Sequence, residues 1–69
     1  MHILVTGGTG FIGRHVVEAA YRHGHTARVA IHRGAALDGS ATEHVRLDLR
    51  DATGLVEALD GVDAVVHCA

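Results

Sequence analysis

The sequence predicts an α/β fold with a doubly wound parallel sheet, and two observations support this prediction. Short apolar, β-branched segments alternate with segments of helical periodicity along the 69 residues, and a glycine-rich turn joins the first strand to the first helix. A series of strand, helix and strand units forms parallel sheets through right-handed crossovers. We therefore expect four strands in the spatial order 3-2-1-4, which is the first part of such a sheet.

The first half of the chain contains two expected strands and one expected helix. His2–Thr6 (HILVT) is a short apolar run, typical of a strand buried inside a parallel sheet. Helical periodicity follows over Phe11–His23, and Gly24 is expected to end this helix. Ala27–His32 (ARVAIH) is the second expected strand. The apolar stripe of the helix is expected to hold Ile12, Val16, Ala19 or Ala20, and His23.

In the second half, Arg33–Glu43 is rich in small and polar residues and is expected to form a loop. Val45–Leu49 is the third expected strand, and Val62–Cys68 (VDAVVHC) is the fourth. Between them, Asp51 is the expected N-cap of a helix that ends at Gly61. Its apolar residues repeat at helical spacing and are Ala52, Leu55, Val56 and Leu59.

Composition argues against several classes of protein. The net charge of -2 does not suit a general nucleic-acid or anionic-membrane binder. No apolar run approaches the roughly 18 residues of a membrane helix, and the start MHILV does not resemble a secretory signal. Cys68 is the single cysteine, so we expect a reducing, cytoplasmic location. The pair His23-x-His25 lacks further ligands, so no metal site is expected.

Residues 6–13 read TGGTGFIG and carry the expected chemistry. A phosphate needs exposed backbone N–H groups, close approach without β-carbons, and the favourable field of a helix N-terminus. We expect Gly7 to form the tight turn, Gly10 to let the backbone approach a pyrophosphate, and Gly13 to let the helix pack against the sheet. The free amides from Gly10 to Ile12, above all those of Phe11 and Ile12, are expected to donate to the phosphates.

Gly8, Gly10 and Gly13 also form the pattern G-x-G-x-x-G. This pattern is a weak signal alone, but here it follows a strand, opens a helix and lies in a βαβ unit. The sequence therefore predicts that residues 1–69 are a partial Rossmann fold, truncated after strand four, that binds NAD or NADP.

The register Thr6-Gly7-x-x-Gly10-x-x-Gly13 resembles the extended short-chain dehydrogenase/reductase superfamily, specifically its NAD(P)-dependent epimerase/dehydratase family. Gly24-His25 is similar to that family's turn before the second strand, residues 48–51 (DLRD) to its D-L-x-D segment, and residues 65–69 (VVHCA) to its V-x-H-x-A strand end. The resemblance implies that Asp48 and Leu49 frame the adenine, with Asp48 accepting a hydrogen bond from the amino group. It also implies that the last residues of the chain lie along the cofactor. The expected cofactor-binding residues are thus Gly7, Thr9, Gly10, Phe11, Ile12, Gly13, Arg33, Asp48, Leu49 and Ala69.

The segment after the second strand bears on the choice of dinucleotide. NAD-selective sites place a carboxylate there to bind the ribose 2′-hydroxyl. Residues 31–34 read IHRG, with no acid before Asp38, and Arg33 suits a 2′-phosphate. The sequence therefore favours NADP, with NAD as the alternative.

No catalytic residue is expected in this chain. The resemblance implies a Tyr-x-x-x-Lys pair after the fourth strand, in which lysine lowers the tyrosine pKa for proton transfer. The single tyrosine is Tyr21, and all six basic residues are arginine. We therefore expect an N-terminal fragment of an oxidoreductase, epimerase or dehydratase that is inactive alone. A small-molecule substrate belongs to the full-length protein, for which a homodimer stays open.

Two other functions remain open from the sequence. One is a redox-inactive, NAD(P)-sensing regulator with the same fold. Absence of a Tyr-x-x-x-Lys pair from the full-length protein would favour this regulator over an enzyme. The other is a flavoprotein that binds FAD, although that class usually has an acid at the end of strand two. His67 is expected to be a satisfied histidine beside the cofactor, and Cys68 a small strand thiol.

Overall fold

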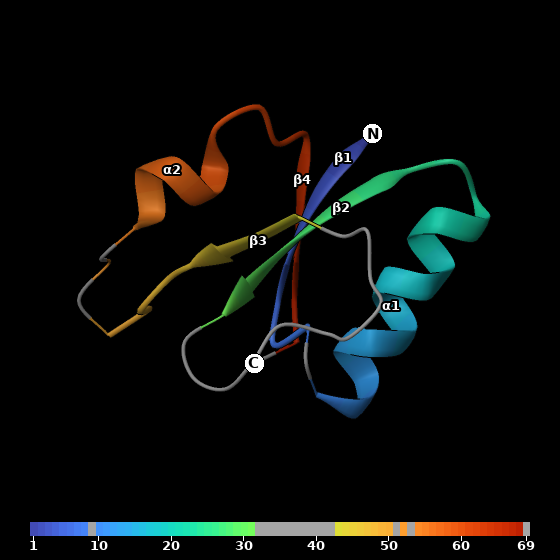
Figure 1. Ribbon diagram of the computed structural model, residues 1–69, viewed down its shortest axis with the longest axis horizontal. Helices are drawn as coiled ribbons and strands as arrows, with labels where there is room; N and C mark the ends of the chain where they lie inside the picture. The colour runs from blue at the N-terminus through green and yellow to red at the C-terminus, as the bar shows by residue number, and fades with distance from the viewer. Residues whose placement is uncertain (9, 32–42, 51, 53, 69) are drawn as a thin grey trace.

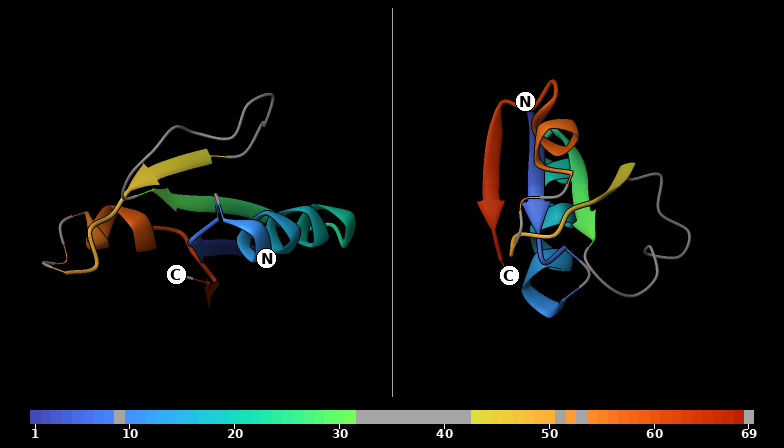
Figure 2. Two further views of the ribbon diagram at one scale, coloured as in Figure 1. Left: turned by 90° about the horizontal axis from the view of Figure 1, so that it is seen from below. Right: turned by 90° about the vertical axis from the view of Figure 1, so that its left-hand side faces the viewer.

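The structure is a computed structural model that describes residues 1–8, 10–31, 43–50, 52 and 54–68. Within them the elements are, in chain order, β1 (His2–Thr6), α1 (Phe11–Arg22), β2 (Thr26–Ile31), β3 (Glu43–Arg46), α2 (Leu55–Leu59) and β4 (Ala64–His67). The strands pair in parallel in the order β3-β2-β1-β4, side by side in the right-hand view of Figure 2. The predicted fold class and strand order are confirmed.

Side chains alternate between the two faces of the sheet, and each face has its own core. Ile3 and Val5 of β1 lie on the face that α1 covers, whereas Leu4 lies on the face of α2. The two helices stand on opposite sides of the sheet (Figure 1). The core beneath α1 contains Ile3, Val5, Val17, Ala20, Ala27, Val29 and Ile31, and the core beneath α2 contains Leu4, Ala30, Leu47 and Ala58. Neither of the helices in the described residues is long and apolar enough to cross a membrane.

Helix α1 packs on a different stripe from the one expected. Its buried residues are Gly13, Val17 and Ala20, whereas Ile12 is 67% exposed. Gly13 brings the helix backbone against the preceding turn, and this contact rotates the buried stripe by one residue. Val16 remains partly buried at the margin of the core, so the predicted stripe is correct for Ala20. It is wrong for Ile12 and for His23, which is the exposed C-cap of the helix.

Helix α2 begins later than predicted. Ala52 has a φ of 62° and Gly54 a φ of 82°, both in the left-handed region, so neither belongs to a right-handed helix. Gly54, rather than Asp51, is the N-cap. The five-residue helix buries Ala58 and leaves the expected apolar stripe of Leu55, Val56 and Leu59 exposed.

Strand β3 also differs from its expected bounds, because it starts at Glu43 and ends at Arg46. Its register pairs Glu43 with Arg28 and Arg46 with Ile31, so the strand ends beside the last residue of β2. Leu47 then turns into the core beneath α2. Asp48 and Leu49, expected as the end of the strand or just past it, thus follow the strand at the carboxyl edge of the sheet.

Candidate functional site

Three glycines shape the turn between β1 and α1. Gly7 has a φ of 69°, in the left-handed region that favours glycine. A β-carbon on Gly8 would lie 2.5 Å from Cγ1 of Val29, and one on Gly13 would lie 2.7 Å from Cα of Gly8. The expected role of Gly7 is confirmed, and Gly13 allows close packing against the turn rather than the sheet. The packing role of Gly8 was missed, because it depends on Val29 in the neighbouring strand.

Gly10 differs from these three glycines. It caps α1 in an extended conformation, with φ -80° and ψ 175°, which any residue can adopt. A β-carbon there would lie 3.4 Å from the Gly7 carbonyl oxygen, an ordinary contact. The packing of the described residues therefore does not require glycine at this position. The Gly10 amide donates to the Gly7 carbonyl at 3.1 Å, so the prediction that this amide is free is wrong.

The first turn of α1 presents further backbone amides. The helix begins at Phe11, as predicted, and its first internal bond runs from the Arg14 amide to the Gly10 carbonyl at 3.0 Å. The amides of Phe11, Ile12 and Gly13 have no acceptor among the described residues. The first turn of α1 contains no acidic residue, so no carboxylate of that turn offsets the positive end of the helix dipole. This arrangement can bind an anion.

Asp48 lies past the end of β3, beside the exposed Leu49. Its Oδ1 accepts hydrogen bonds from the backbone amide of Arg50 at 3.0 Å and from Nε of Arg50 at 3.2 Å, and its Oδ2 accepts one from Nη2 at 3.2 Å. These bonds raise the pKa of Arg50. An adenine amino group on Asp48, which the resemblance implies, would have to share the carboxylate with Arg50.

The carboxyl ends of β1 and β4 meet in a polar contact that sequence reasoning missed. Oγ1 of Thr6 lies 2.6 Å from Nδ1 of His67, and it accepts a hydrogen bond from the Cys68 amide at 3.2 Å. The sequence predicts a hydrogen-bonded His67, but it predicts Thr6 only as part of the glycine motif. The adjacency of strands one and four, which was predicted, could have indicated this pair because both residues end their strands.

Thr9, Arg33 and Ala69 lie outside the described residues, as does Asp51. The structure thus brings the glycine turn, the start of α1 and the end of β4 together around β1. It places Asp48 and Leu49 two strands away, past the end of β3.

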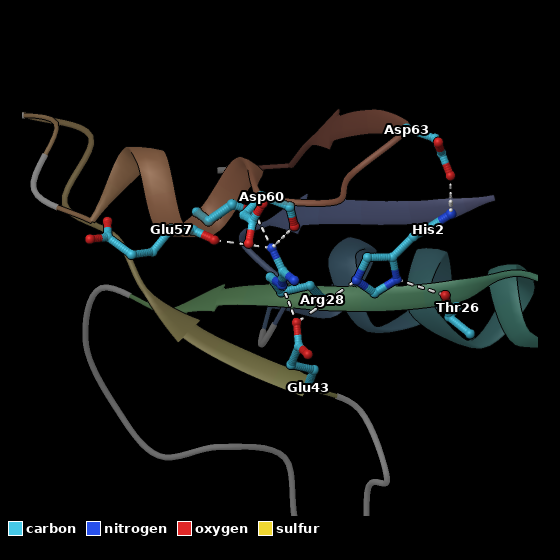
Figure 3. Close-up of polar contacts among 8 residues, drawn as sticks. His2, Thr26, Arg28, Glu43, Glu57, Asp60 and Asp63 are labelled. Carbon is cyan, nitrogen blue, oxygen red and sulfur yellow. Dashed lines mark hydrogen bonds and ion pairs between the residues drawn. The ribbon is translucent and has the colours of Figure 1, made fainter.

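A separate network, centred on Arg28 of β2, ties α2 to the sheet near the amino ends of the strands (Figure 3). The Arg28 side chain is 14% exposed. Its Nη1 donates to the carbonyl oxygens of Glu57, Ala58 and Asp60 at 3.1, 2.8 and 2.7 Å. These carbonyls lie at the C-terminal end of α2, where a cation also interacts favourably with the helix dipole.

The same arginine ties β3 to β2. Nε of Arg28 donates to the Glu43 carboxylate, and this hydrogen bond lowers the pKa of Glu43. Nε2 of His2 lies 3.8 Å from Oε1 of Glu43, and Nδ1 of His2 lies 2.6 Å from Oγ1 of Thr26 (Figure 3). The network therefore joins the first three strands at their amino ends and has a structural role.

Comparison with known protein families shows to which family this chain belongs. The family described as "NAD dependent epimerase/dehydratase family" matches residues 3–69. The chain belongs to this family. Among its relatives, sterol demethylase protein B of Methylococcus capsulatus is 43% identical over 72 residues, with coverage of 100% of this chain and 22% of that protein.

Solved structures agree with this family membership. A short-chain dehydrogenase/reductase superfamily protein from Agrobacterium tumefaciens, crystallised with bound NAD, has a TM-score of 0.80 and 39% identity, covering 100% of this chain and 20% of that one. The UDP-N-acetylglucosamine 4-epimerase from Bacillus cereus has a TM-score of 0.76 and 35% identity, covering 97% and 21%. This chain thus spans about a fifth of the length of these proteins.

Proposed function

We propose that residues 1–69 are the dinucleotide-binding half-domain of an epimerase, dehydratase or reductase of the extended short-chain dehydrogenase type. The start of α1 carries this proposal. The amides of Phe11, Ile12 and Gly13 lack acceptors among the described residues, and Gly10 beside them is not required by internal packing. A pyrophosphate at this point would satisfy the amides and give a reason for the missing side chain at Gly10.

In this proposal the adenosine half of the cofactor extends toward β3. The Asp48 carboxylate accepts a hydrogen bond from the adenine amino group, and the exposed side chain of Leu49 packs against the adenine. Thr9 and Ala69 complete the set of cofactor-binding residues. Asp48 is hydrogen-bonded to Arg50, so adenine binding requires this guanidinium to share the carboxylate or leave it.

For the choice of dinucleotide we propose a preference for NADP. The support is the sequence IHRG at residues 31–34, where Arg33 suits a 2′-phosphate and no acid precedes Asp38. The bound NAD in the Agrobacterium tumefaciens structure belongs to a protein of which only 20% aligns with this chain, at 39% identity. The two cofactors must therefore be compared directly.

Chemistry requires residues beyond these 69. The sequence contains no lysine, so the Tyr-x-x-x-Lys pair of the family is not within it, and we propose that the chain alone is inactive. The substrate, a small molecule, would bind to other parts of the full-length protein.

Calorimetric titration of the intact protein with ADP, NAD and NADP tests the proposal. We expect all three to bind, because each carries adenosine and two linked phosphates, and NADP to bind more tightly than NAD. Replacement Arg33→Ser should reduce the affinity for NADP and leave that for NAD unchanged. If none of the three ligands binds, the proposed function is overturned. If NAD binds more tightly than NADP, only the NADP preference is overturned.

A further inference from the structure

The contact between Thr6 and His67 has features of a built arrangement. The two residues are direct partners in the parallel register of β1 and β4. Thr6 is 4% exposed, and among the described residues it is the one polar residue that is buried. Its Oγ1 has two partners there, namely Nδ1 of His67 at 2.6 Å and the amide of Cys68 at 3.2 Å. A polar group in such a position is normally fully hydrogen-bonded.

These two contacts determine where the hydrogen atoms lie. The Cys68 amide can only donate, so the Thr6 oxygen accepts this bond. The hydroxyl hydrogen then needs an acceptor, and Nδ1 of His67 is the one within reach among the described residues. If Nδ1 carried a hydrogen, it would donate to Thr6 and leave the buried hydroxyl hydrogen unpaired, which is unfavourable. Neutral His67 therefore carries its hydrogen on Nε2.

The sheet order indicates what this Nε2–H can meet. In the proposed function the pyrophosphate lies at the turn after β1, and the adenosine half extends over β2 toward Asp48 after β3. Since β4 lies on the other side of β1, the second half of the dinucleotide would extend over β4. His67 ends β4, and its ring is exposed there. Nε2 is across the ring from Nδ1 and has no partner among the described residues.

We propose that Thr6 holds His67 in the Nε2–H tautomer, and that His67 donates this hydrogen to a hydroxyl of the ribose on the nicotinamide side of the dinucleotide. His67 is thus a binding residue and Thr6 a positioning residue. The inference rests on the proposed function and adds to it a contact for the second ribose.

Nitrogen-15 NMR of the intact protein, labelled at histidine and held at mildly alkaline pH where imidazoles are neutral, tests the tautomer. The His67 signal is identified by its loss in His67→Asn. We expect protonation at Nε2 alone in the wild type, a mixture of tautomers in Thr6→Val, and the wild-type pattern again in Thr6→Ser. A wild-type His67 that carries its hydrogen on Nδ1 would overturn the inference without any need for the variants.

The binding role is tested with ADP and ADP-ribose, which differ by the second ribose. Asparagine at position 67 can still accept a bond from Thr6 near the place of Nδ1, but it has no group in the place of Nε2. We expect His67→Asn to weaken ADP-ribose about fivefold, as loss of one hydrogen bond should, and to leave ADP unchanged. Unchanged affinity for ADP-ribose, or an equal loss for both ligands, would contradict the proposal. If the wild type binds neither ligand, the proposed function itself fails, which distinguishes the two cases.

Discussion

Gly13 lies so close to Gly7 that a β-carbon on Gly13 would overlap the carbonyl oxygen of Gly7 and lie 2.7 Å from its carbonyl carbon. Both groups belong to the backbone and cannot rotate away. The first helix therefore stands directly on the turn that follows β1. The position of the amides of Phe11 and Ile12 depends on this contact.

Replacement Gly13→Ala should therefore destabilise the protein by about 3 kcal/mol, because the overlap must be relieved by moving the helix or the turn. Thermal or urea denaturation measures this loss. Gly10→Ala is the matched control, since the same β-carbon at that position makes only an ordinary contact and should cost at most about 1 kcal/mol. Equal stability of the two variants would show that α1 does not pack on the turn as described.

Arg28 should be the most important charged residue for the attachment of α2. Arg28→Ala removes three bonds to carbonyl oxygens and the contact with Glu43, and we expect a loss of about 2–3 kcal/mol in the free energy of unfolding. Arg28→Lys should recover only part of it, because one ammonium group cannot reach both the helix end and Glu43.

The control for this prediction is Arg22→Ala. Arg22 forms an exposed pair with Glu18 one helical turn away, and its loss should cost about 0.5 kcal/mol or less. Hydrogen exchange should also show faster opening of α2 in Arg28→Ala. Slow, wild-type exchange in this variant would exclude the proposed role of Arg28.

The lowered pKa of Glu43 predicts a pH dependence of stability. The hydrogen bond from Arg28 favours the ionised carboxylate in the folded state, so its pKa is lower folded than unfolded. The resulting stabilisation is present above the unfolded pKa and is lost as pH falls through the folded pKa. The difference in stability between the wild type and Glu43→Gln should therefore be largest near neutral pH and shrink below about pH 4. A difference that stays constant across this range would contradict the assignment.

The strand order and the start of α1 could be predicted because they depend on local signals. The apolar run His2–Thr6 and the glycines after it define a buried strand and a turn, and both appear at the expected residues. The late start of α2 could not be predicted, because helical periodicity does not reveal the left-handed backbone of Ala52.

Contacts between distant residues account for the remaining differences. Gly13 sets the buried stripe of α1 through the turn, and Arg28 joins Glu43 to the end of α2 across 15 or more residues of sequence. The bond between Thr6 and His67 likewise requires two strands to be in register. Single-sequence patterns place such residues on elements but do not pair them.

The affinity of Gly10→Ala for NAD and NADP is the decisive measurement for the proposed pyrophosphate site at the start of α1. The described residues leave room for a β-carbon at Gly10. In the proposed function, the pyrophosphate on the amides of Phe11 and Ile12 would occupy this space. We expect the variant to keep nearly wild-type stability and to bind both cofactors at least tenfold more weakly. A tenfold change corresponds to a loss of about 1.4 kcal/mol in binding free energy. Wild-type affinity in a folded Gly10→Ala protein would contradict the account.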